Sequence, residues 1–271
     1  MPPTRTLSRV LVLLALLWSN ACSTDAIAWS DPVSFAAANA DERLTVDSRG
    51  RVQLVRDTSL SVDPSAVDPR ICLASLQVAR QDDGTLAAAW WSVRPDSSAL
   101  LLAAVSPDGG RAWLAPIRVD TADVSVVGCA RPAPSIAASG GFMHLAYAMR
   151  ASEGTGIFYA HSMTRGRTYE PPVAIIYGDH LTRTAVAADA GVICVAYEDP
   201  NGTDPQIGLA ISRDWGHIFG ERLRGSTGLG GAAMPQVAVT GRQVAVSWLQ
   251  RAASADAAVR PTRVVRVGRL P

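Results

Sequence analysis

The sequence predicts an all-β fold: a small β-propeller of about four to five four-stranded blades, closed by the N-terminal strand. Three observations lead to this prediction. A turn motif occurs three times at nearly constant spacing, a glycine followed by an apolar run recurs with the same period, and the last repeat ends one strand short. Four short strands in each repeat of about 50 residues are typical of propeller blades.

The turn motif has the pattern Ser-x-Asp-x-Gly-x-x-aromatic, and its copies begin 56 and 50 residues apart. The aspartate can accept backbone N–H bonds inside a tight turn. The glycine can adopt a conformation that strains other residues, and the aromatic ring can pack back between blades. The motif residues are Ser106, Asp108, Gly110 and Trp113 in the first copy; Ser162, Gly166 and Tyr169 in the second, with Thr164 replacing the aspartate; and Ser212, Asp214, Gly216 and Phe219 in the third.

β-like runs surround each motif. The run before it begins at a glycine and has an aromatic residue at its seventh place, in 84–90, 141–147 and 191–197, and a longer version fills 241–248. Each repeat therefore supplies four strands. The other runs are 76–79, 134–137, 184–187 and 235–238 before each glycine, and 115–119, 172–175 and 221–224 after each motif.

The two ends of the chain are predicted to meet in one blade. The last repeat lacks the turn motif and ends at 264–267, whereas 28–33 resembles the fourth strand of the other repeats. An N-terminal strand in that place would remove an exposed sheet edge. A shorter hairpin is predicted within residues 42–62, which gives four full blades and a truncated one.

Residues 1–22 are predicted to be a signal peptide, because a positively charged start precedes eight apolar residues and then small residues. Eight apolar residues are too few for a membrane-spanning helix, which needs about 20. Residues 18–22 resemble a bacterial lipobox, with Ser19 where leucine is usual, so lipidation of Cys22 and ordinary cleavage both stay open. The domain at 23–271 is expected to be periplasmic, or held at the membrane only by lipid on Cys22.

The composition of the chain excludes some classes of partner and cofactor. The net charge is +1 with no concentrated basic face, so we expect no nucleic-acid partner. The four histidines are scattered and no two cysteines have metal-ligand spacing, so no metal and no cofactor are expected.

Cys72 and Cys129 occupy similar places before the first strand of their blades. A disulfide between them and two reduced thiols are both open, whereas Cys194 lies in an apolar run and is expected to be a buried filler.

Propeller topology assigns the loops to two faces. The turn motifs, between third and fourth strands, lie on one face, and the loops after second strands and between blades lie on the other. Arginines and carboxylates around an opening on that second face can bind an anionic or polyhydroxylated ligand; simple solvation of polar loops is the alternative. The candidate ligand-binding residues are Arg70, Arg94, Arg131, Arg150, Arg183, Glu198 and Asp199.

The turn motif resembles the Asp box (BNR repeat) of sialidases, over most of residues 70–270. The resemblance implies a ligand on the face opposite the Asp boxes. Active sialidases clamp the sugar carboxylate with three arginines and use an aspartate as acid/base and a tyrosine nucleophile helped by a glutamate. Arg94 and Asp96 match the second arginine and the acid/base. Arg70 is displaced by two residues from the first arginine, and no third arginine has a matching context. Tyr197 and Glu198 are strand neighbours that point to opposite faces, so they do not form the Tyr/Glu pair.

These departures favour a non-catalytic propeller that binds a glycan or an envelope protein at the cell envelope. The alternative is an exo-α-sialidase or related glycoside hydrolase in which Asp96 is the catalytic acid/base. The two hypotheses differ in what they require of Asp96: a titratable carboxyl group beside the ligand in the second, and no particular role in the first.

Overall fold

The computed structural model describes residues 27–35, 42–56, 68–228, 231–251 and 261–271. The predicted signal peptide with Cys22, and residues 57–62 of the predicted hairpin, lie outside the described residues. The described part is all-β, apart from a short 3-10 turn at Leu73–Ser75. None of its helical structure is long and apolar enough to cross a membrane.

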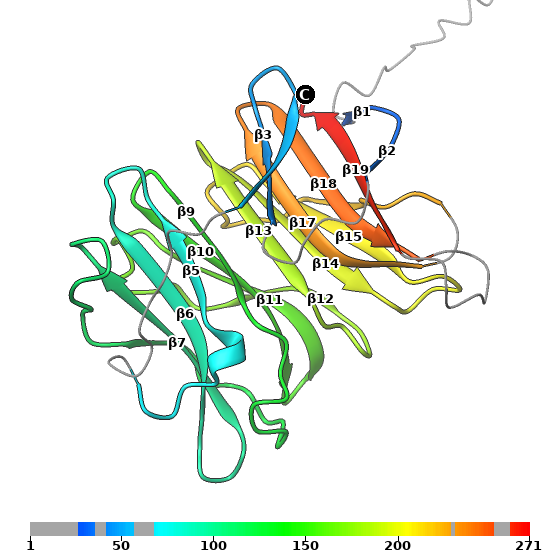
Figure 1. Ribbon diagram of the computed structural model, residues 1–271. Helices are drawn as coiled ribbons and strands as arrows, with labels where there is room; N and C mark the ends of the chain where they lie inside the picture. The colour runs from blue at the N-terminus through cyan, green and yellow to red at the C-terminus, as the bar shows by residue number, and fades with distance from the viewer. Residues whose placement is uncertain (1–26, 36–41, 57–67, 229–230, 252–260) are drawn as a thin grey trace, which may run out of the picture.

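Three four-stranded antiparallel sheets follow one another along the chain (Figure 1), and each uses four consecutive strands in order. The first contains β5 (Gln77–Arg80), β6 (Leu86–Val93), β7 (Ala99–Ser106) and β8 (Ile117–Asp120). The second contains β9 (Ser135–Ser139), β10 (Phe142–Ala151), β11 (Gly154–Ser162) and β12 (Val173–Tyr177). The third contains β13 (Thr184–Asp189), β14 (Val192–Asp199), β15 (Gln206–Ser212) and β16 (Glu221–Arg224).

The last sheet is built from both ends of the chain. Ala28 lies opposite Arg269, and Val33 lies opposite Val265. The N-terminal segment therefore supplies the outer edge of this sheet, at the place predicted for it. The strands are β17 (Ala232–Thr240), β18 (Gln243–Gln250) and β19 (Thr262–Arg269), with β1 (Ala28–Trp29) and β2 (Val33–Phe35) paired to β19.

A two-stranded hairpin, β3 (Glu42–Val46) and β4 (Val52–Arg56), stands beside the last sheet. Leu44 and Val46 are buried in a cluster with Val265 of β19. Because a two-stranded hairpin buries little apolar surface by itself, its packing on the last sheet stabilises it.

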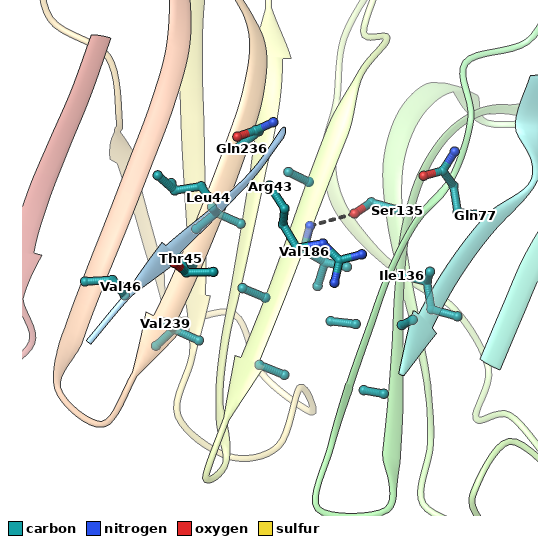
Figure 2. Close-up of a pocket in the computed structure, with 18 of the residues that line it drawn as sticks. Arg43, Leu44, Thr45, Val46, Gln77, Ser135, Ile136, Val186, Gln236 and Val239 are labelled. Carbon is teal, nitrogen blue, oxygen red and sulfur yellow. Dashed lines mark hydrogen bonds between the residues drawn. The ribbon is translucent and has the colours of Figure 1, made fainter. Parts of the chain in front are cut away.

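The first strands of the four large sheets, β5, β9, β13 and β17, line one cavity together with β3 (Figure 2). The cavity has a volume of about 530 Å³. Neighbouring inner strands are joined across it, since the Val186 N–H donates to Ser135 Oγ at 2.8 Å (Figure 2). Separate sheets that share a cavity lined by their inner strands are consistent with a propeller-like fold.

Aromatic side chains fill the space between neighbouring sheets. Trp91 of β6 meets Tyr147 of β10 edge-on, with ring centroids 5.9 Å apart. Tyr159 of β11 meets Phe219 of the third sheet in the same way, at 4.8 Å. Central strands such as β6 and β7 are covered on both faces, so their sequences are continuous apolar runs rather than alternating ones.

The three turn motifs, called Asp-box turns below, link the third to the fourth strand of their sheets. In the first, the Ser106 hydroxyl donates to Asp108 Oδ1 at 2.7 Å and accepts the Gly110 N–H at 2.7 Å. The same Asp108 oxygen accepts the N–H groups of Arg111 and Ala112 at 3.0 and 2.9 Å. Gly110 has a φ of 101°, which other residues rarely adopt.

The other two turns repeat this scheme. In the third, Asp214 accepts from the Ser212 hydroxyl at 2.6 Å and from the Ile218 N–H at 2.9 Å. In the second, Thr164 Oγ1 accepts the Thr168 N–H at 2.9 Å. A hydroxyl thus occupies the place of the carboxylate there, with one backbone bond instead of the two at Asp108.

A disulfide joins Cys72 to Cys129, whose Cα atoms lie 5.3 Å apart. It links the segment before the first sheet to the segment before the second, which is one of the two states that the sequence left open. Cys194 is a free thiol, fully buried on β14, and burial raises its pKa to about 12. This thiol is an apolar filler at neutral pH.

Candidate functional site

A smaller pocket of about 200 Å³ lies where the inner strands begin, and we call it the axial pocket. Gln77, Ser135 and Gln236 line both this pocket and the larger cavity, so the two adjoin. The pocket collects residues from β5, β9, β13, β17 and β19 although these strands are far apart in sequence. Its lining residues are Gln77, Ala133, Pro134, Ser135, Arg183, Thr184, Met234, Pro235, Gln236 and Arg263.

Arg263 is the buried cation of the axial pocket, with only 4% of its surface exposed. Its Nη1 donates to Ser247 Oγ on the adjacent strand at 3.0 Å, and its buried Nε has no hydrogen-bond partner. Burial lowers the pKa of Arg263, and the nearby Glu42 carboxylate opposes that shift. Among the described residues no carboxylate forms an ion pair with Arg263. A buried cation without a paired anion is costly, so an anion in the pocket would be stabilised strongly.

Gln236 supplies an unpaired acceptor in the same pocket. Its Nε2 donates to the Glu42 carbonyl oxygen at 2.7 Å, which fixes the amide, while its buried Oε1 has no partner. Buried polar atoms in native proteins are nearly always paired. A ligand that carries both an anionic oxygen and a hydroxyl could pair with Arg263 Nε and Gln236 Oε1 together.

Arg183 lines this pocket, and Glu198 contacts another of its lining residues, Met234. Arg183 is exposed and can place a second positive charge at the rim. Glu198 is engaged on both oxygens, by the Thr182 hydroxyl and by the Met234 N–H at 2.7 Å. Glu198 therefore fastens β14 to β17 and to the segment before β13, rather than facing a ligand freely.

Glu198 lines a second pocket, which has a volume of about 410 Å³. Its ionisable residues are His180, Asp204 and Arg251, together with Glu198. The remaining lining residues are Thr182, Pro200, Pro205, Gly231, Ala232 and Ala233.

The sequence predicts that Arg131 binds ligand, but the structure uses this residue internally. Its guanidinium pairs with Asp123 and donates to the Ser125 carbonyl oxygen at 2.6 Å and the Ser97 carbonyl oxygen at 3.2 Å. The side chains of Arg131 and Asp123 are 5% and 2% exposed. Because both Nη atoms of Arg131 donate inside the loop, this residue holds the link between the first two sheets, and its buried Nε has no hydrogen-bond partner.

Arg94 and Asp96 stabilise the β6–β7 hairpin. The Arg94 guanidinium donates to Ser98 Oγ and to the Thr121 carbonyl oxygen, each at 3.0 Å. Asp96 Oδ1 accepts from the Ser98 N–H at 3.0 Å and from the Ser98 hydroxyl at 2.6 Å, and these bonds hold the pKa of Asp96 below its usual value. A general acid needs a raised pKa, so the geometry gives Asp96 a role in the turn.

The other predicted residues divide between two regions. Arg70 is exposed and its Nε lies 3.7 Å from Asp68 Oδ1. The Arg150 carbonyl oxygen accepts the Val124 N–H at 2.9 Å, which places it beside the link that contains Arg131. Asp199 caps its own turn, accepting the N–H of Asn201 at 3.0 Å. None of these residues lines the axial pocket.

Sequence reasoning missed Arg263 and Gln236. The alternation of the last strand could have identified Arg263. This residue shares a face with Val265 and Val267, so it is a charged residue at an inward-facing position.

The four histidines are scattered in the sequence, but His144, His161 and His217 come together in the structure. No group of three or more His, Cys, Asp or Glu placed to hold a metal ion occurs among the described residues.

No protein-family model matches the sequence, and no curated protein matches it. Solved structures do resemble the fold. A Hadza microbial sialidase is 15% identical, with a TM-score of 0.46, over 65% of this chain and 42% of its own length. A β-fructofuranosidase from Bombyx mori is 12% identical, with a TM-score of 0.44, over 75% of this chain and 48% of its own.

A protein of unknown function from Dyadobacter fermentans is 13% identical, with a TM-score of 0.43, over 90% of this chain and 99% of its own length. The chain spans less than half the length of the sialidase and of the β-fructofuranosidase. At this level of likeness, neither a family nor an activity passes from these proteins to this chain.

Proposed function

We propose that this chain is a non-catalytic, propeller-like binding protein that holds an anionic, polyhydroxylated group, such as the acidic end of a glycan, in the axial pocket. The observation that carries the proposal is the buried Arg263, whose Nε lacks a partner in the same pocket as the unpaired Gln236 Oε1. Guanidinium–carboxylate pairing is strong and directional. A sugar hydroxyl would donate a hydrogen bond to the Gln236 amide oxygen, which has no partner. Arg183 adds charge at the rim. An envelope protein that offers an acidic side chain is the other partner of suitable chemistry.

The hydrolase alternative has less support. Asp96 lies outside the axial pocket, holds Ser98 with its carboxylate, and has a lowered pKa, which suits a turn better than proton donation. The proposal is therefore binding without turnover.

We infer that the binding protein acts outside the cytoplasm, with Cys22 either lipidated or part of a chain from which an ordinary signal peptide is cleaved. The Cys72–Cys129 disulfide supports this place, because disulfides persist in oxidising compartments. The inner strands of five sheets around one cavity support a ring of five blades, with β3 and β4 as the truncated one.

The test measures binding of glucuronic acid and of glucose, a matched acidic and neutral pair, to residues 23–271 by calorimetry. We expect glucuronic acid to bind more tightly, and Arg183→Gln or Gln236→Leu to weaken it by about tenfold or more. Arg70→Gln removes an exposed arginine outside the pocket and is the matched control. Equal losses in Arg70→Gln and Arg183→Gln would reject the axial pocket. Hydrolysis of a fluorogenic sialoside that vanishes in Asp96→Asn would favour the enzyme instead.

A further inference from the structure

Three histidines meet where the third Asp-box turn, Ser212–Phe219, covers the second sheet. His144 on β10 and His161 on β11 are cross-strand partners, with ring centroids 6.5 Å apart. His217 belongs to the turn, and its ring meets His161 edge-on at 4.9 Å. His144 and His161 are 1% and 5% exposed, so two ionisable rings are buried at this junction.

The turn fits closely against the sheet around these rings. Trp215 packs on Phe142 with centroids 4.6 Å apart, and Phe219 packs on Tyr159. Gly216 sits directly over the Tyr159 ring, where a Cβ atom would overlap Tyr159 Oη. Close packing of this kind leaves no room for water to solvate a charged imidazole.

Hydrogen bonding at the junction is suited to neutral imidazoles. His144 Nδ1 pairs with Tyr159 Oη at 2.6 Å, whereas the buried His161 Nε2 has no partner at all. His217 Nδ1 pairs with the Asp214 carbonyl oxygen inside the turn. A proton added to His161 Nε2 would have no acceptor and would face a second histidine.

Few nearby groups can compensate such a charge. The turn contributes Asp214, whose Oδ1 already accepts from Ser212 and Ile218, and the segment after the second Asp-box turn contributes Glu170. The strands β13 and β14 contribute Val186, Ala188, Ile193, Val195 and Tyr197 to the cluster that contains Tyr159. Burial, with His161 adding to it, lowers the pKa of His144 to about 3. Burial and His217 lower that of His161, against Asp214 and Glu170, which raise it.

We propose that His144 and His161, covered by His217 of the turn, form an acid-sensitive latch: on acidification, protonation of the two buried rings separates the third Asp-box turn from β10 and β11. The latch is distinct from the axial pocket and does not depend on the proposed ligand.

The direction of the effect follows from linkage. In the opened state His144 and His161 regain an ordinary pKa near 6.5, whereas in the latched state their buried rings stay neutral. Opening therefore takes up protons, and it becomes more favourable as the pH falls below about 6.5. Between pH 7.5 and 5.0 each buried histidine multiplies the opening equilibrium by up to about thirtyfold.

Hydrogen–deuterium exchange of the mature chain at pH 7.5 and 5.0, corrected for intrinsic exchange rates, tests the latch. The amides of Gly216 and Ile218 report on the third turn, and those of Gly110 and Ala112, with equivalent bonds and no histidine nearby, are the internal control. We expect opening of the third turn to rise at least tenfold relative to the first turn at pH 5.0. Equal responses in the two turns would overturn the proposal, and this comparison needs no variant.

Variants then identify the sensor. His161→Gln and His144→Gln should each reduce the pH response of the third turn, and the double variant should abolish it. His180→Gln, which changes an exposed histidine lining the second pocket, should leave the response unchanged. If the double variant keeps its fold at pH 7.5, judged by circular dichroism, and still opens with acid as the wild type does, the histidines are not the sensor.

Discussion

The Tyr147 hydroxyl on β10 donates to Asp120 Oδ2 at the end of β8 at 2.6 Å, and this bond crosses from the second sheet to the first. Both residues are buried. Burial, together with the Asp120 carboxylate, raises the pKa of Tyr147, so the hydroxyl keeps its proton over the whole physiological range. The bond therefore fixes the relative position of two sheets through a buried charge-assisted contact.

Removing the hydroxyl should loosen this junction. We expect Tyr147→Phe to lower the free energy of unfolding by about 1–3 kcal/mol, because Asp120 Oδ2 is left buried without that donor. Urea denaturation measures the change. Tyr177→Phe on β12, where the ring is half exposed, should change it by less than about 0.5 kcal/mol. Equal effects of the two changes would argue against a specific role for Asp120.

The Cys72–Cys129 disulfide should carry a large part of the stability. It closes a loop of 57 residues, for which chain entropy gives about 4 kcal/mol. We expect the Cys72→Ala/Cys129→Ala double variant to melt at a clearly lower temperature than the oxidised protein. Reductant should lower the melting temperature of the wild type and leave that of the variant unchanged. A reductant effect that persists in the variant would contradict this assignment, because the variant lacks the Cys72–Cys129 disulfide.

The second Asp-box turn offers a stabilising change. Thr164→Asp restores a carboxylate that can accept from the Thr168 N–H and a second backbone N–H, as Asp108 does. We expect a gain of about 0.5–1 kcal/mol in thermal or urea unfolding. Thr164→Ala should be less stable than the wild type, because the Thr168 N–H loses its acceptor. If Thr164→Asp proves destabilising, the second turn does not tolerate the geometry of the other two.

Arg131 should matter for stability and not for ligand recognition. Arg131→Met leaves the Asp123 carboxylate buried and unpaired, so we expect a loss of about 3–5 kcal/mol in unfolding free energy. Arg165→Met breaks an exposed pair with Asp83 and is the matched control, with little change in stability expected because solvent screens that pair. An unchanged stability in Arg131→Met, with weakened glucuronic acid binding, would return Arg131 to the ligand-binding group.

The sequence predicted those features whose cause is local. The Asp-box turns depend on side chains within a few residues of one another, so Ser106, Asp108 and Gly110 could be assigned to a turn from the sequence alone. The N-terminal strand could be assigned to the last sheet because each repeat was expected to have four strands and the last repeat lacked its fourth. Because the same pattern occurs in several repeats, each copy supports the interpretation of the others, which a single turn motif could not do.

The site depends on pairings between distant residues, and here sequence reasoning was weaker. The sequence shows that Arg131 and Asp123 are charged, but it does not show that the loop folds so as to pair them. Arg263 was missed because the last strand was expected to begin at Val264, and Gln236 because an amide in an inner strand is an ordinary residue. His144 and His161 are 17 residues apart, and only the β10–β11 register places them opposite each other.

The pairing of β1 and β2 with β19 has a consequence for the order of synthesis. The strands β1 and β2 are made long before their partner β19, so this sheet cannot form until β19 has left the ribosome. A nascent chain would carry its first strands unpaired while the three middle sheets assemble. Loss of β1 and β2 would open the edge of β19 to aggregation, and loss of β19 would open the edge of β18.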